Sequence, residues 1–167
     1  DDIRNVIERS SARETAARTA AGALCKELLR AFDISWLAHV THLGAVATRS
    51  RDWTERRAPN AFVRAVESSP VRCADSAAAR RMVAAIDAAK KRGATLGGIY
   101  ETVFFNLPPG LGSCMQWDRK LDARLAFGIL SIHAQKAVEI GDGFAGALLL
   151  GSKVHDEIFY SRSRGFY

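Results

Sequence analysis

Residues 9–31 read RSSARETAARTAAGALCKELLRA, and this segment predicts the first long helix of the protein. Ser11 is placed to cap the helix, and Glu14, three residues later, completes the Ser-x-x-Glu pattern of a capping box. Small or apolar residues recur every four positions on one face: Ala12, Ala16, Ala20, Leu24 and Leu28. Because small residues let other backbones approach closely, we expect this helix to be packed on several sides and to end near Ala31.

The pattern of residues 34–105 predicts alternating strands and helices. Residues 34–40 alternate in polarity and residues 99–105 are rich in β-branched and aromatic side chains, so both predict strands. A second helix is predicted from its cap at Asp75 to Arg92, because Gly93 follows as a stop signal. Residues 44–72 lack clear periodicity and are rich in arginine. We interpret them as a surface excursion with a short helix near residues 62–66.

The last third of the chain has shorter elements. Asp118 is predicted to cap a third helix that carries Leu121, Leu125 and Ile129 on one face. Short apolar runs at residues 138–140 and 147–150 predict strands, residues 141–143 predict a turn, and a loose polar tail is expected from Ser161. Without a repeat, linker or boundary, the pattern indicates a single α+β domain over residues 1–167.

Composition is that of an ordinary globular protein. Hydrophobic residues make up 48% and charged residues 25% of the 167 residues. No apolar run approaches the roughly 18 residues that a membrane span needs, and the first residues lack a secretory segment. The three cysteines are widely spaced without a Cys-x-x-Cys pair, which indicates reduced thiols rather than disulfides or a zinc site. We therefore expect a cytoplasmic protein without a metal ion or a membrane partner.

Positive charge is concentrated in the first part of the chain. Residues 1–100 contain 17 Lys and Arg against 11 Asp and Glu, whereas residues 101–167 contain seven of each, which accounts for the net charge of +6. Such an excess can attract nucleic acid, a membrane surface or a phosphorylated small molecule. Arginine suits phosphate because its planar fork binds in a bidentate way. Charge alone leaves the three alternatives open.

The start of the first long helix is the strongest candidate site. The first backbone N–H groups of a helix are unsatisfied and its dipole places positive charge there, so the end attracts anions. Arg9 precedes this end, Arg13 lies in its first turn, and Ser10 and Ser11 lie between them. These groups could hold a phosphate or the polar part of a flavin together. The alternative is that Ser11 only caps the helix and both arginines are solvated.

Other polar clusters are weaker candidates. Residues 146–153 approximate a phosphate-binding loop, but Ser152 and Lys153 stand in the wrong order and the intervening residues are apolar. His39 and His42 fall on opposite faces of a predicted strand, and His155 has no second cluster of ligands. We therefore predict neither a nucleotide loop nor a metal site.

Four segments, in this order along the chain, resemble signature stretches of chorismate synthase. They are residues 9–16 (RSSARETA), 107–113 (LPPGLGS), 118–125 (DRKLDARL) and 136–144 (KAVEIGDGF). The resemblance covers essentially the whole chain, weakly between residues 44 and 74 and strongly from residue 97 to residue 144. Departures are few: Ala137 stands where the family usually has glycine, and His133 where asparagine or glutamine is common.

The resemblance implies a fold and a reaction. The fold is a β-α-β sandwich with helices between antiparallel sheets, assembled as a homotetramer in the full-length family. The reaction is the anti-1,4-elimination of phosphate from 5-enolpyruvylshikimate 3-phosphate to give chorismate, the last step of the shikimate pathway to aromatic amino acids. It requires reduced flavin mononucleotide (FMN), which is thought to lend an electron transiently, and some members reduce the flavin with NADPH. By resemblance, Arg9, Ser10 and Ser11 contact the flavin and Arg13 lies against the substrate.

The resemblance also limits what the chain is expected to do. The family's catalytic histidines lie in motifs upstream of the matching region, so we expect no catalytic residue here and no turnover by this central portion alone. Sheet edges and apolar faces are expected to be uncovered. Two other functions stay open: a basic module that binds polyanions such as nucleic acid, and a non-catalytic fragment that oligomerises. The first lacks a basic surface interleaved with aromatic residues for stacking bases.

Overall fold

The computed structural model of the protein describes residues 2–10, 12–49, 51–53, 55–155, 157–163 and 165–166. The chain forms two compact units. Unit 1 comprises residues 1–18 and 110–167, and unit 2 comprises residues 19–109. The single domain expected over residues 1–167 stays a prediction. The α+β class is confirmed, since helices accompany an antiparallel sheet.

Unit 2 is built on an antiparallel sheet of three strands in the order β2-β1-β3. The strands are β1 (Ser35–Leu43), β2 (Val46–Ala47) and β3 (Gly98–Phe105). β1 and β3 pair along their whole length, beginning with Ser35 opposite Phe105. Both agree with the predicted strands, because β-branched and aromatic side chains suit a pleated, half-buried surface.

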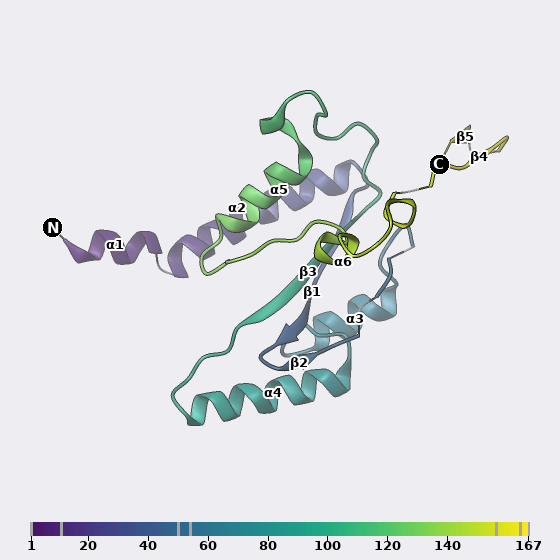
Figure 1. Ribbon diagram of the computed structural model, residues 1–167. Helices are drawn as coiled ribbons and strands as arrows, with labels where there is room; N and C mark the ends of the chain where they lie inside the picture. The colour runs from purple at the N-terminus through teal and green to yellow at the C-terminus, as the bar shows by residue number, and fades with distance from the viewer. Residues whose placement is uncertain are drawn as a thin grey trace. The chain divides into compact units, whose positions relative to one another are not determined.

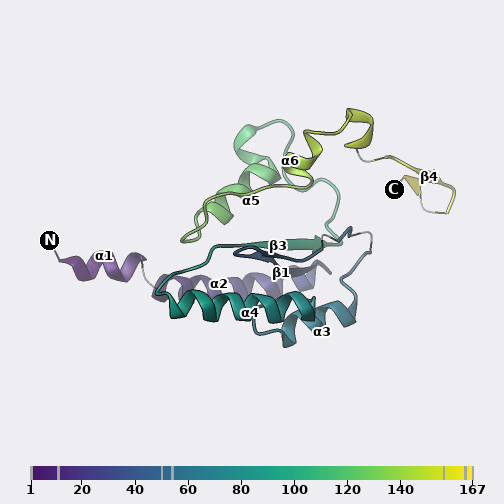
Figure 2. The same ribbon diagram turned by 60° about the horizontal axis from the view of Figure 1, so that its bottom comes forward.

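Three helices accompany this sheet: α2 (Ala12–Ala31), α3 (Asn60–Ser68) and α4 (Ser76–Lys91). Figure 2 shows α3, α4 and the part of α2 in unit 2 on the same side of β1 and β3. The predicted cap of α4 is confirmed, since the Asp75 carboxylate accepts hydrogen bonds from the backbone N–H groups of Ala77 and Ala78 at 2.8 and 3.0 Å. Gly93 follows in a left-handed conformation with φ of +64°, which ends the helix as predicted.

The core of unit 2 lies between the sheet and α3 and α4. One cluster joins Leu37 and Phe105 to Val66 of α3, with Trp53 and Phe62 packed against it. Residues 44–72 therefore supply core side chains, and the predicted surface excursion is wrong. These apolar residues are irregularly spaced among arginines, so the sequence shows no periodic pattern that would indicate their burial. The short helix expected there is confirmed as α3.

The apolar stripe of α2 differs from its prediction. Leu24 and Leu28 are 76% and 61% exposed, so this helix is not enclosed on several sides in the described part of the chain. The length of α2 was predicted well because its ends depend on local sequence signals. Its packing depends on partners that the pattern alone does not identify.

Unit 1 contains α1, the first turns of α2 and a series of short elements (Figure 1). These are α1 (Ile3–Ser10), η1 (Trp117–Arg119), α5 (Leu121–Leu130), α6 (Gly143–Gly146), η2 (Gly151–Lys153), β4 (Tyr160–Ser161) and β5 (Gly165–Phe166). The sequence analysis missed α1, although Ile3, Val6 and Ile7 have helical spacing. It also expected a loose tail, where β4 pairs with β5.

Three further expectations in unit 1 are wrong. Residues 138–140 and 147–150 are not strands, and Leu148 is 88% exposed. A short apolar run forms a strand only where another strand supplies its hydrogen bonds. Asp118 lies in η1 and does not cap the third helix, because α5 begins after Lys120. The turn at residues 141–143 is confirmed by Gly141, with φ of +60°.

Large apolar side chains are exposed in both units, as expected. In unit 1, Met115, Trp117 and Phe144 are each more than 80% exposed. Edge strand β3 of unit 2 exposes 57% of Ile99. No helix of the described residues is long and apolar enough to cross a membrane.

Candidate functional site

The structure places the predicted anion-binding residues on both sides of the junction between α1 and α2. Arg9 and Ser10 are the last two residues of α1, and Arg13 is the second residue of α2. Ser11, the predicted cap and flavin contact, lies outside the described residues. The predicted helix start is thus confirmed, with a second helix directly before it.

Arg13 forms an ion pair across this junction. Its Nη1 lies 2.7 Å from Oε1 and 2.6 Å from Oε2 of Glu8 on α1. The two side chains are 78% and 47% exposed, and an ion pair this exposed contributes little to stability. A doubly charged phosphate group offers stronger acceptors. It can therefore compete with Glu8 for Arg13.

Ser10 is oriented toward its own helix. Its hydroxyl donates a hydrogen bond to the carbonyl oxygen of Val6 at 2.7 Å. In this orientation the hydroxyl oxygen can only accept further hydrogen bonds. Ser10 therefore suits a donor on a ligand, such as an N–H group, better than a phosphate oxygen. This differs from the sequence argument, which treated both serine hydroxyls as anion donors.

Glu14 binds Arg18, four residues later on α2. The Glu14 Oε1 lies 2.9 Å from both Nε and Nη2 of Arg18. The hydrogen bond from Arg18 is the main cause that lowers the pKa of Glu14, and the positive charge of Arg18 lowers it further. The capping box expected between Ser11 and Glu14 involves a residue outside the described part of the chain, so it stays a prediction.

Arg18 also reaches the end of α5, a contact that the sequence analysis missed. Its Nη1 donates to the Ser131 hydroxyl at 3.0 Å, and this hydroxyl donates to the carbonyl oxygen of Gly128 at 2.7 Å. The two residues are 113 positions apart, so no local pattern predicts their contact. The start of α2 and the end of α5 are adjacent within unit 1.

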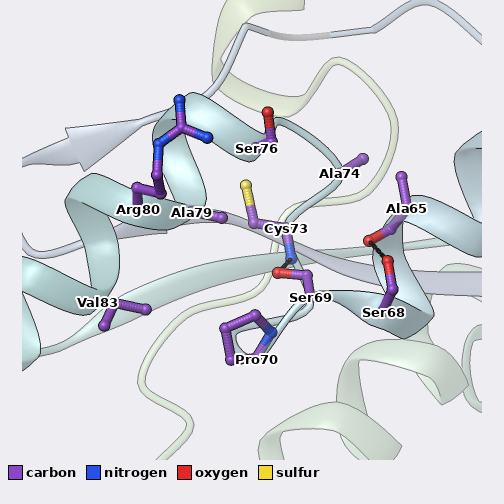
Figure 3. A pocket seen from close by; sticks show the side chains of 10 residues that line it. All are labelled: Ala65, Ser68, Ser69, Pro70, Cys73, Ala74, Ser76, Ala79, Arg80 and Val83. Atoms are coloured by element: carbon purple, nitrogen blue, oxygen red, sulfur yellow. Dashed lines mark hydrogen bonds between the residues drawn. The ribbon is translucent and has the colours of Figure 1, made fainter.

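Two pockets formed by described residues lie away from this junction. One of about 410 Å³ is formed by the end of α3 and the start of α4, where Figure 3 shows Ser69, Cys73, Ser76 and Arg80. Burial raises the pKa of Cys73, and its thiol lies 3.4 Å from the carbonyl oxygen of Asp75. A protonated, buried thiol is a poor nucleophile. The other pocket, of about 770 Å³, includes residues 110–114 of unit 1.

His39 is buried in unit 2 and is hydrogen-bonded there. Its Nε2 lies 2.7 Å from Oε2 of Glu101, and Trp53 Nε1 donates to the same oxygen at 3.0 Å. Within the described part of the chain, no group of three or more His, Cys, Asp or Glu side chains is arranged to hold a metal ion.

Comparison with known proteins identifies relatives along the whole chain. Residues 1–165 match the family described as chorismate synthase. The chain is 52% identical over 166 residues to chorismate synthase from Symbiobacterium thermophilum and 52% identical over 167 residues to that from Moorella thermoacetica. Each alignment covers 99% of this chain and 42% of the relative.

A solved structure agrees with these sequence matches. The crystal structure of a chorismate synthase superposes with a TM-score of 0.89 at 41% sequence identity, covering 99% of this chain and 51% of that one. The chain therefore spans less than half the length of the curated relatives it matches.

Proposed function

Because the chain belongs to the chorismate synthase family, we propose that it supplies part of the active site of such an enzyme. The reaction is the anti-1,4-elimination of phosphate from 5-enolpyruvylshikimate 3-phosphate, which gives chorismate. The observation that carries this proposal is the exposed, basic junction between α1 and α2. It lies in the segment that resembles the family's flavin and substrate contacts.

Arg13 would bind the phosphate of the substrate. Its guanidinium is 78% exposed and forms an ion pair with the exposed Glu8 carboxylate, so it is accessible to a phosphorylated ligand. As the phosphate leaves, negative charge grows on its oxygens, and a fixed cation stabilises that charge. The N-terminal turn of α2 adds the positive end of a long helix.

The junction also fits the polar part of FMN. Arg9 is exposed at the end of α1, and the Ser10 hydroxyl oxygen can accept a hydrogen bond from a flavin N–H group. Together with Ser11, these residues would hold the cofactor and orient it toward the substrate. Reduced FMN, when bound, would supply electron density transiently, without net oxidation. The proposal extends to the family's homotetramer for the full-length protein.

A chimera tests this function directly. This chain would replace the matching segment of the Symbiobacterium thermophilum relative, and chorismate formation would be measured anaerobically with chemically reduced FMN. A parallel assay with oxidised FMN and NADPH would show whether the protein also reduces the flavin. We expect chorismate formation, and we expect Arg13→Ala to lower kcat/KM by about tenfold or more, the effect of one lost charge-assisted hydrogen bond.

The matched control is Arg64→Ala, which removes an exposed arginine from α3. It should leave kcat/KM close to that of the parent chimera. Equal losses in both variants would contradict a specific role of Arg13. An inactive, folded parent chimera would contradict the proposed function. Strong, salt-sensitive DNA binding by such a protein would favour the basic polyanion-binding alternative.

A further inference from the structure

We propose that Arg18 is a positioning residue that ties the end of α5 to the start of α2, beside the anion-binding junction. This inference rests on the proposed function, since the junction is where FMN and the phosphorylated substrate would bind. Arg18 would act through the segment it holds and would not itself touch either ligand.

The geometry uses all three nitrogens of one guanidinium. Nε and Nη2 of Arg18 both lie 2.9 Å from Oε1 of Glu14, while Nη1 lies 3.0 Å from the Ser131 hydroxyl oxygen. The Ser131 hydroxyl in turn donates a hydrogen bond to the carbonyl oxygen of Gly128 at 2.7 Å. A planar, rigid fork can hold two partners at fixed angles, which a lysine ammonium cannot. The four residues form one continuous hydrogen-bonded chain between the two helices.

Arg18 differs from the proposed ligand-binding Arg13 in its charge pairing and its exposure. Its charge is matched by Glu14, whose lowered pKa is caused first by Arg18, so Glu14 remains a carboxylate at neutral pH. The Arg18 and Glu14 side chains are only 43% and 29% exposed, against 78% for Arg13. An anion arriving from solvent therefore meets Arg13 more readily than Arg18.

The segment after Ser131 is held near the first turn of α2. Ala134 follows in a left-handed conformation with φ of +66°, so the chain turns sharply there. Ser131 also ends α5 as its C-cap residue. Loss of the Arg18 contact should release this turn and remove one wall of the junction.

The test is a double-mutant cycle in the chimera described above, with Arg18→Gln, Ser131→Ala and the double variant. Hydrogen exchange of the Ser131 and Ile132 amides reports the end of α5, and quenching of FMN fluorescence reports ligand affinity. For each single variant we expect about threefold to tenfold faster exchange and weaker FMN binding by a similar factor. The double variant should lose no more than either single one, because both remove one interaction.

Two controls separate positioning from general destabilisation. Ser131→Thr keeps the hydroxyl and should restore exchange and affinity, whereas Arg18→Lys should not. Arg30→Gln removes a guanidinium that also pairs with a glutamate on α2, and it should change neither readout. Helix content by circular dichroism should stay constant throughout.

The possible outcomes distinguish this inference from the proposed function on which it rests. Additive losses, or variants with unchanged exchange and FMN affinity, would overturn the role of Arg18 while leaving the flavin site intact. Faster exchange with unchanged FMN affinity would show a purely structural contact and would also overturn it. Failure of the folded parent chimera to bind FMN would overturn the proposed flavin site together with this inference.

Discussion

The two methionines of the chain provide a matched test of the core of unit 2. Met82 on α4 is completely buried and packs with Cys73, Ala78 and Ala79, whereas Met115 in unit 1 is 83% exposed. Met82→Ala removes every side-chain atom beyond Cβ from this cluster. The neighbouring alanines are too short to fill the space, so a cavity should remain. We expect a loss of about 3–5 kcal/mol in the free energy of unfolding, the upper half of the usual range.

That loss is large compared with the stability of a typical domain, about 5–15 kcal/mol. Urea unfolding would be followed by the fluorescence of Trp53, whose ring lies 5.1 Å from that of Phe62 and 5.7 Å from that of Phe105. The Met82→Ala midpoint should fall by about 1.5 M or more. Met115→Ala should stay within about 0.5 kcal/mol of the parent. A small loss for Met82→Ala, or equal losses for both variants, would mean that unit 2 lacks the packed core described here.

Three further predictions concern hydrogen bonds of unit 2. The backbone carbonyl oxygen of Arg72 accepts from the Val40 N–H at 2.9 Å, and its Nη2 donates to the Ala38 carbonyl oxygen at 3.1 Å. Arg72→Ala keeps the first bond and removes the second, so it should speed amide exchange in β1 near Ala38 by about tenfold, as measured by NMR. Backbone hydrogen bonds from Ala78 and Ala77 lower the pKa of Asp75 below its usual value of 3.8. The contribution of Asp75 to the free energy of unfolding is therefore complete above pH 3.8 and is lost as the pH falls through the lower pKa of the folded protein. Asp75→Ala should flatten this dependence of stability on acid pH, as measured by urea titrations. Trp53→Phe keeps the ring packing but removes the donor to Glu101, and it should cost about 1 kcal/mol by thermal unfolding.

Local signals predicted the long elements well. The Asp75 cap and the Gly93 stop mark the two ends of α4, and residues 99–105 coincide with all but the first residue of β3. Such signals act within a few residues, so they can be read from sequence. The runs at residues 138–140 and 147–150 failed because strand formation depends on a partner strand, which local sequence does not specify. Trp53 and Phe62 were missed because their burial arises from contacts with distant strands.

The candidate site was predicted in part. Sequence placed Arg9, Ser10 and Arg13 at a helix start, and the structure places them at the α1–α2 junction. It could not show that Arg13 binds Glu8 or that Ser10 turns back to its own helix, since rotamers follow the surrounding packing. The contact of Arg18 with Ser131 joins residues that are 113 positions apart and has no local signal.

The most direct test of the account is a titration of FMN with the chimera described above, followed by fluorescence quenching, with and without 5-enolpyruvylshikimate 3-phosphate. Parent, Arg13→Ala and Arg64→Ala proteins would be compared at one ionic strength. We predict that FMN binds, that the substrate tightens its binding, and that Arg13→Ala alone loses this tightening. FMN binding that is absent from the folded parent chimera, or a substrate effect that survives in Arg13→Ala, would contradict a flavin and phosphate site at the α1–α2 junction.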